Sequence, residues 1–181
     1  MKKHLRARLL EEADIRRALA RIAHEIIERN GHQDSLTLIG IQRRGVPLAE
    51  LIAENIRKFS DIKTELATVD ITYFRDDMDH SRADPEAKAQ TPPCSLKDKT
   101  VILVDDVIYT GRTARAAMDA ISSWGRPARI QLAVLIDRGH RELPLRGDYI
   151  GKNVPTAKSE RVEVHIPPID QRFDVELYEI K

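Results

Sequence analysis

VILVDDVIYTGRT, residues 101–113, joins a run of apolar residues to two adjacent aspartates, Asp105 and Asp106, and then to a Thr-Gly-Arg-Thr turn. The apolar run is typical of a buried strand in a parallel sheet, and a segment with helical periodicity follows the turn. In an open parallel sheet, ligands bind outside the carboxyl ends of the strands. The two carboxylates are therefore predicted to stand at a ligand-binding end of such a sheet.

The chemistry of this strand end favours a sugar phosphate. Two neighbouring carboxylates repel each other and lose solvation there, so they need hydroxyl groups or a cation close by. A sugar diol or a Mg²⁺-bound ligand supplies these. The turn offers Gly111 for close backbone approach, the hydroxyls of Thr110 and Thr113, and the amides of a helix N-terminus. The aspartates are thus predicted to hold a ribose, and the turn its 5′-phosphate.

Other interpretations of the same stretch differ in strength. The aspartate pair taken alone is also compatible with a loop start and a helix cap, because Asp is common at such positions. A nucleotide P-loop requires a Gly-Lys-Ser/Thr ending, and TGRT has no lysine. A receiver-type acidic pocket requires an acid pair early in the chain and a phospho-accepting aspartate on another strand. Neither of these two rival sites fits.

Length and composition set broad limits. The 181 residues suit one domain, 1–181, with a real hydrophobic core. Lys and Arg number 30 against 29 for Asp and Glu, so a nucleic acid or a membrane must be bound through a local patch. Cys94 is the only cysteine, which excludes an intrachain disulfide. No export signal and no apolar stretch of 18 residues is evident, so a cytoplasmic protein is expected.

The rest of the chain alternates strands and helices. Hydrophobic periodicity predicts helices at residues 11–30, 46–59 and 112–123. Strands are predicted at residues 35–41, 64–74, 100–106, 129–137, 161–166 and 173–180. This order predicts an α/β fold in which a mostly parallel sheet of about five strands has helices on both faces. A polar stretch without periodicity, about residues 74–98, is expected to be a functional lid or a disordered loop.

Residues 101–113 resemble the phosphoribosyl-diphosphate (PRPP) binding signature of type I phosphoribosyltransferases. The resemblance extends over essentially the whole chain, to the bifunctional pyrimidine operon attenuator and uracil phosphoribosyltransferase family. It is carried by the segments IRRALARIAHEIIERN (15–30), GIQRRGVPLA (40–49), DITYFRDD (70–77) and RIQLAVLIDRGHRELPLRGDYIGKNVPT (129–156). It implies a type I phosphoribosyltransferase fold with a small hood, formed mainly by residues 138–181.

The resemblance also implies roles for individual residues. Asp105 and Asp106 would hold the ribose hydroxyls near the cationic ribose that develops as diphosphate leaves. Arg43 and Arg44, also implied to be catalytic, would neutralise that diphosphate, and the Arg43–Arg44 peptide bond is expected to be cis. A solvated basic turn is the alternative for this loop. The implied PRPP-binding residues are Arg43, Arg44, Gly45, Asp105, Asp106, Val107, Ile108, Tyr109, Thr110, Gly111, Arg112 and Thr113.

The remaining implied contacts surround the same site. Mg²⁺ would enter bound to PRPP, without a cage of protein ligands. The loop at about 74–98 would close over the site and exclude water, with Arg75 as its ligand contact. Asp137 and Arg138 would meet uracil. The PRPP signature is shared with purine and orotate transferases, and DRGHRELPLRGDYIGKNVPT (137–156) favours the pyrimidine enzyme over them.

A second activity is implied for basic residues that transfer chemistry does not use. In the resembled family, such a surface binds the mRNA leader of the pyrimidine operon, and UMP or UTP strengthens binding. The implied RNA-binding residues are Arg21, His24, Arg29, His140, Arg141, Arg146 and Lys152. Ala20 stands where close relatives commonly have threonine, so one hydroxyl is missing. A solvated helix face, or support of the hood or of a homo-oligomer interface, is the alternative, and a regulator with weak catalysis stays open.

Overall fold

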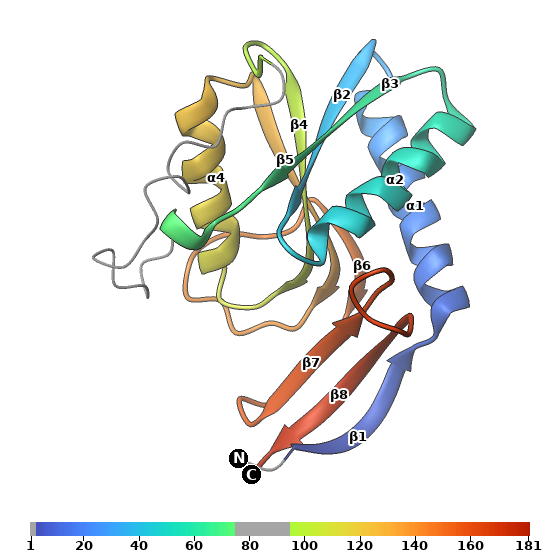
Figure 1. Cartoon of the computed structure of the whole chain (residues 1–181), viewed down its shortest axis with the longest axis vertical. Coiled ribbons are helices and arrows are strands. Elements are labelled where there is room, and N and C mark those ends of the chain that lie inside the picture. Colours follow the sequence, from blue (N-terminus) through green and yellow to red (C-terminus); the bar gives the residue numbers. More distant parts are fainter. Residues whose placement is uncertain (1–2, 75–94) are drawn as a thin grey trace.

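The computed structural model describes residues 3–74 and 95–181, whose strands form two sheets (Figure 1). The larger sheet has five strands, and every neighbouring pair is parallel. In spatial order they are β3 (Lys63–Val69), β2 (Ser35–Ile41), β4 (Thr100–Ile108), β5 (Arg129–Asp137) and β6 (Tyr149–Asn153). The predicted α/β fold with a parallel sheet of about five strands is therefore confirmed.

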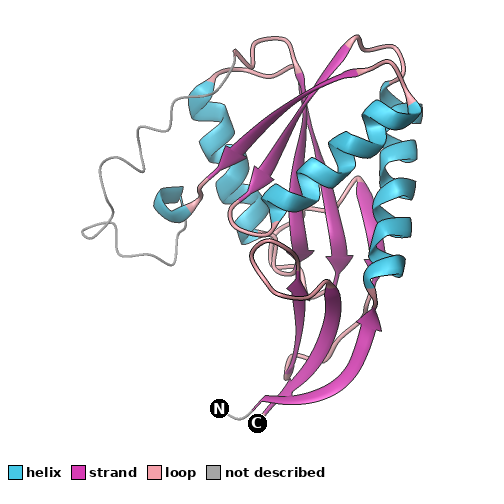
Figure 2. Cartoon of the chain, turned by 45° about the vertical axis from the view of Figure 1, so that its right-hand side comes forward, coloured by secondary structure: helices cyan, strands magenta, loops and turns pink. Residues whose placement is uncertain are grey.

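Helices cover both faces of this sheet (Figure 2). On one face, α1 (Glu12–Asn30) and α2 (Gly45–Phe59) pack into one hydrophobic cluster, and on the other face α4 (Arg112–Trp124) packs into a second cluster. The central strand β4 contributes to both clusters, because successive side chains of a strand point to opposite faces. This burial of apolar surface on two sides is the main stabilising contribution to the fold. None of the described helices is long and apolar enough to span a membrane.

The smaller sheet, the hood, has the antiparallel order β1-β8-β7, with β1 (Lys3–Leu10), β8 (Asp174–Ile180) and β7 (Glu160–His165). It lies beside the end of β4, where the two sheets face each other across a cavity. The hood differs from the expected 138–181 in two ways. β6 pairs with β5 in the core sheet, and β1, far away in sequence, completes the hood. β6 is short and β1 is mostly exposed, and each lies at the edge of its sheet. Neither strand therefore has the alternation of apolar and polar residues from which a strand is predicted.

The other elements agree with the expected ones, with one exception. The strand expected at 64–74 ends at Val69. A carboxylate oxygen of Asp70 accepts hydrogen bonds from the Thr72 N–H, at 2.9 Å, and from the Thr72 hydroxyl, at 2.6 Å. Aspartate favours such a turn over an extended strand, and a short 3-10 helix, η1 (Thr72–Phe74), follows.

Candidate active site

Asp105 and Asp106 stand at the end of β4, the first buried and the second half-buried. Oδ1 of Asp105 accepts from the Asp106 N–H at 2.9 Å, and Oδ1 of Asp106 accepts from the Val107 N–H at 2.7 Å. Burial, and then the charge of Asp106, raises the pKa of Asp105 well above its usual value. Burial also raises the pKa of Asp106, against the Val107 hydrogen bond that lowers it. Without a partner, the ionised pair is costly to the folded protein.

The turn after β4 and the start of α4 line a cavity of about 240 Å³ together with Asp105. The helix begins at Arg112 without a side-chain cap, so its first N–H groups have no partner within the helix. Gly111 has a φ of +92°, a conformation that side chains rarely adopt. A turn of this conformation beside an uncapped helix N-terminus fits a phosphate group.

The loop after β2 packs directly against the end of β4. A Cβ added at Gly45 would lie 2.3 Å from the carbonyl oxygen of Val104, so only glycine permits this approach. The non-proline cis peptide bond of this loop joins Gln42 to Arg43. The expected position, Arg43–Arg44, was therefore wrong by one residue, because the residue type before a non-proline cis bond gives no signal of its place.

The two arginines of this loop have different surroundings. Arg43 is exposed, whereas Nε and Nη2 of Arg44 donate to the two carboxylate oxygens of Asp170, each at 3.0 Å. The hydrogen bond to Asp170 raises the pKa of Arg44 above its usual value. Asp170 follows β7, so this bidentate pair ties the loop to the hood.

A second cavity, of about 410 Å³, lies between Asp106 and the hood. Its lining includes the basic side chains of Lys3, Arg44 and Arg161, together with His165 and with Glu163, which forms ion pairs with Lys3 and Arg161. The two cavities thus share the acid pair, since Asp105 lines the first and Asp106 the second. Lys3, Arg161 and His165 were missed in the sequence because they lie on strands at opposite ends of the chain. The alternation in RVEVHI, with Val162 and Val164 buried, was the available signal for Arg161 and His165.

The predicted base-binding residues, Asp137 and Arg138, lie at the end of β5 and are engaged within the protein. Arg138 is buried, and it donates to the Thr156 hydroxyl at 3.1 Å and to the Glu160 carbonyl at 2.7 Å. Its guanidinium carbon is 4.0 Å from the centre of the Tyr109 ring, a cation–π contact, and burial lowers the pKa of Arg138. These bonds make Arg138 a link between β5, the phosphate turn and the hood.

The predicted RNA-binding residues fall into two groups. The first lies where α1 meets β6, where Arg21 and Arg29 form bonds from the helix to residues at or beside the strand and Lys152 bonds to the end of β1. Arg21 Nη2 donates to the carbonyls of Ile150 and Gly151 at 2.9 and 2.7 Å, Arg29 Nη1 to Asp148 Oδ1 at 2.8 Å, and Lys152 Nζ to the Leu9 carbonyl at 3.2 Å. The ring of His24, also in this group, stacks on Phe59 with centroids 4.4 Å apart.

The second group lies after β5, beside the active site. Nε2 of His140 is hydrogen-bonded to the Thr156 carbonyl at 2.5 Å. Arg141 forms an ion pair with Asp137 at 2.5 Å, and Arg146 is exposed. Of these three, Arg146 is exposed, whereas His140 and Arg141 are half-buried and bonded within the protein. Arg75 and most of the loop expected at 74–98 lie outside the described residues.

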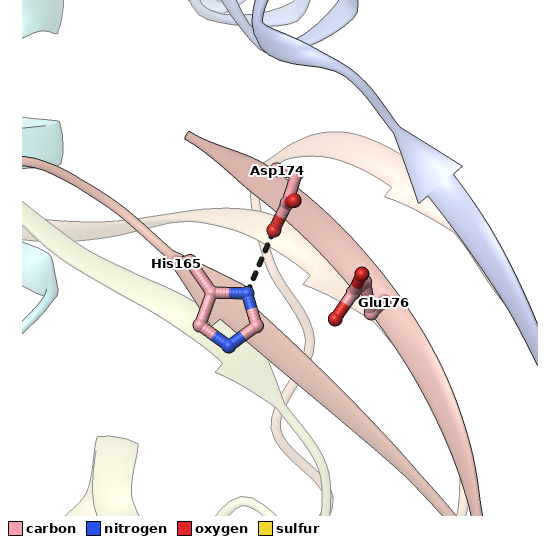
Figure 3. Close-up of side chains that lie close together, drawn as sticks. All are labelled: His165, Asp174 and Glu176. Atoms are coloured by element: carbon pink, nitrogen blue, oxygen red, sulfur yellow. Dashed lines mark hydrogen bonds and ion pairs between the residues drawn. The ribbon is translucent and has the colours of Figure 1, made fainter. Parts of the chain in front are cut away.

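A cluster in the hood has the residue types of a metal site, His165, Asp174 and Glu176 (Figure 3). His165 Nδ1 lies 2.7 Å from Asp174 Oδ1, and Glu176 accepts from Arg172 at 2.9 Å and from the Tyr178 hydroxyl at 2.6 Å. Arg8 also lies within ion-pair distance of Asp174 and Glu176. Because guanidinium groups already neutralise both carboxylates, this arrangement is an ion-pair network joining β1, β7 and β8.

Comparisons with known proteins agree with this geometry. The family model for the phosphoribosyl transferase domain matches residues 6–167. A protein of Clostridium acetobutylicum named "Bifunctional protein PyrR" is 53% identical over 177 residues, which cover 98% of this chain and 99% of the relative. The chain belongs to the PyrR family of phosphoribosyltransferases. The PyrR of Clostridium novyi is 54% identical over 171 residues, covering 94% of this chain and 96% of its own.

Solved structures of similar fold are more distant from this PyrR-family chain in sequence. A hypoxanthine phosphoribosyltransferase of Trypanosoma cruzi matches with a TM-score of 0.73 at 17% identity, covering 98% of both chains. A hypoxanthine-guanine phosphoribosyltransferase of Bacillus anthracis matches with a TM-score of 0.70 at 15% identity, covering 97% of this chain and 99% of the other. The type I phosphoribosyltransferase fold expected from the sequence is therefore confirmed.

Proposed function

We propose that this PyrR-family protein transfers the ribose 5-phosphate of PRPP to uracil, which yields UMP and diphosphate. The observation that carries the proposal is the acid pair between two cavities. One cavity has the amide-rich turn suited to a 5′-phosphate, and the other has basic side chains suited to diphosphate. A ribose bridging the cavities would lie at Asp105 and Asp106.

The proposed reaction forms one bond at C1′ and breaks another. The bond between C1′ and the diphosphate oxygen breaks and its electron pair leaves with diphosphate. N1 of uracil bonds to C1′, and its proton passes to diphosphate or water. Asp105 and Asp106 would accept hydrogen bonds from the ribose hydroxyls, and their negative charge would stabilise the positive charge that develops on the ribose. Arg43 and Arg44 would stabilise the departing diphosphate.

We propose Mg²⁺ as the ion that accompanies PRPP. Hard oxygen donors suit this ion, which keeps most of its ligands from substrate and water, and the carboxylates of Asp105 and Asp106 are donors of this kind. When bound, the ion supplies positive charge that neutralises the diphosphate. The protein's own contribution is to orient the ribose between the two cavities.

Uracil is proposed as the base because the segment 137–156 resembles that of the pyrimidine enzymes. Asp137 and Arg138 are proposed to shape the base site from the end of β5, where their bonds hold the neighbouring loops. Steady-state assays with PRPP and uracil, orotate, hypoxanthine or guanine test this choice. We expect turnover of uracil alone, and turnover of a purine in its place would overturn the proposal.

The second proposed activity is binding of the pyrimidine-operon mRNA leader, strengthened by UMP or UTP. The curated relatives are named bifunctional, and Arg21 and Arg29 are about half exposed where α1 meets β6, although each is paired with an acidic side chain. Gel-shift titration of the leader with and without UMP tests this activity, and an affinity that does not change with UMP would argue against nucleotide control.

A homodimer or larger homo-oligomer in the cytoplasm is proposed from the family resemblance. Light scattering measures the oligomeric state.

A further inference from the structure

The side chain of Arg141 lies between two loops of the active site, with only 20% of its surface exposed. Its Nε donates to the Leu145 carbonyl at 2.8 Å, and its Nη1 donates to the Tyr109 carbonyl at 2.9 Å. Its Nη2 donates to Oδ2 of Asp137 at 2.5 Å. The guanidinium therefore bridges the phosphate turn, the end of β5 and the loop that follows β5.

The loop after β5 is bound to the phosphate turn at further points. The Glu142 and Leu143 N–H groups donate to the Thr110 carbonyl at 2.9 and 3.0 Å. The Arg112 side chain donates to the Glu142 carboxylate at 2.8 Å. A Cβ added at Gly111 would lie 3.4 Å from the Cβ of Leu143, so the loop after β5 packs closely against the turn. The two loops therefore form one packed unit.

These bonds determine the orientation of the backbone N–H groups in the phosphate turn. The peptide units 109–110 and 110–111 are trans, and in a planar trans peptide the N–H points opposite to the C=O. Arg141 holds the Tyr109 carbonyl, while the Glu142 and Leu143 amides hold the Thr110 carbonyl. The N–H groups of Thr110 and Gly111 must then face the opposite way. Both residues line the cavity assigned to the phosphate.

We infer that Arg141 is a positioning residue of the phosphate site, which fixes the Thr110 amide for the 5′-phosphate of PRPP and UMP. The inference rests on the proposed phosphoribosyl transfer. It differs from the role expected from the sequence, a direct contact to RNA. Arg141 would then affect RNA binding through UMP, because a ligand acts on a second site only by its different affinity for two states of the protein.

Calorimetry of PRPP and UMP binding to Arg141→Ala, together with steady-state kinetics, tests this inference. One charged hydrogen bond to the turn is lost, so we expect the dissociation constants of PRPP and UMP and the KM for PRPP to rise about ten- to a hundredfold. The KM for uracil should stay near that of the wild type. Arg141→Lys should not restore binding, since an ammonium group cannot reach three acceptors placed for a planar guanidinium.

Arg129→Ala is the matched control, because Arg129 is exposed at the opposite end of β5. It should bind PRPP as the wild type does. If Arg141→Ala does not fold, as judged by circular dichroism, Arg141→Lys decides the question alone. Unchanged PRPP binding in the folded variant would overturn the inference, as would weaker binding of the RNA leader in the absence of any nucleotide. A wild-type protein that binds PRPP but transfers it to no base would instead overturn the proposed function.

Discussion

At the scale of single residues, Asp105 shows a conflict between stability and function. Its carboxylate is buried beside a second carboxylate, and its Oδ1 accepts a hydrogen bond from the Asp106 N–H. A ribose would provide the hydroxyl donors that this carboxylate needs when ionised. Asp105 therefore favours binding of the substrate and lowers the stability of the unliganded protein.

Asp105→Asn should abolish uracil transfer and yet raise the free energy of unfolding by about 1–2 kcal/mol at neutral pH. The raised pKa means that the folded protein binds this proton more tightly than the unfolded chain does. The Asp105 contribution to stability is therefore lost as the pH rises above about 3.8, the usual value. Urea unfolding at about pH 4 and pH 8 measures the effect. A gap between variant and wild type that does not widen with pH would contradict it.

At the scale of elements, a buried polar triad fixes α1 against the core sheet. Asn30 Nδ2 donates to Gln131 Oε1 at 3.0 Å and to the Tyr149 hydroxyl at 3.1 Å, and that hydroxyl donates to Gln131 Oε1 at 2.8 Å. The three residues belong to α1, β5 and β6. Since all are buried, the triad specifies how α1 is placed, and with it the proposed RNA surface.

Tyr149→Phe should lower the free energy of unfolding by about 1–2 kcal/mol, because it removes the buried hydroxyl that donates to Gln131 and accepts from Asn30. The ring would still fill its place in the core. Denaturant unfolding measures the loss, and PRPP binding should not change. Stability equal to that of the wild type would show that water or a rearranged Asn30 replaces the hydroxyl.

In the hood, the ion-pair network around Glu176 joins the strands of the smaller sheet. Burial raises the pKa of Glu176, but the hydrogen bonds from Tyr178 and Arg172 outweigh it and leave the pKa below its usual value. The stability from this group is present above about 4.5 and is lost as the pH falls through the lower, folded-state pKa.

Arg172→Ala should lower the free energy of unfolding at neutral pH, because the buried Glu176 carboxylate then keeps only Arg8 and the Tyr178 hydroxyl as partners. At about pH 3 the cost should be smaller, because a protonated Glu176 needs no cation. Thermal unfolding at both pH values tests this, and Arg6→Ala, whose partner Glu160 lies at the rim of the same sheet, is a control with a small effect. An equal loss at both pH values would mean that packing of the Arg172 stem accounts for the effect.

At the scale of the whole molecule, the net charge of +1 gives no general attraction to RNA. Any binding must come from local groups of arginines, and the structure has engaged most of them in internal bonds. Arg146 remains exposed beside the active site. The salt dependence of binding then reports how many such side chains reach phosphates.

Arg146→Ala should weaken binding of the leader and reduce the slope of log affinity against log salt concentration by about 1, as expected for the loss of one phosphate contact. Gel shifts at several salt concentrations, with UMP present, measure both quantities. Arg129→Ala, on the opposite end of the sheet, should leave them unchanged. A lower affinity with an unchanged slope would point to a contact with a base.

Much of the fold and of the phosphate site was predictable because the signals are local. Residues 101–113 place the acid pair and the phosphate turn on consecutive elements, so their proximity follows from the chain itself. The apolar periodicity of α1, α2 and the central strands likewise follows from burial on defined faces. The edge strands β1 and β6 could not be predicted in this way, since few of their side chains are buried.

The sequence by itself determined the family, the parallel core and the identity of the acid pair, because each depends on residues that are close along the chain. Only the tertiary structure decided which distant side chains meet at that pair. It brought Lys3 and Arg161 to the second cavity, joined Arg44 to Asp170, and turned Arg141 inward to the phosphate turn. Long arginine and lysine side chains can either extend into solvent or donate to a buried acceptor. Their roles therefore depend on which carbonyls and carboxylates the fold places within reach.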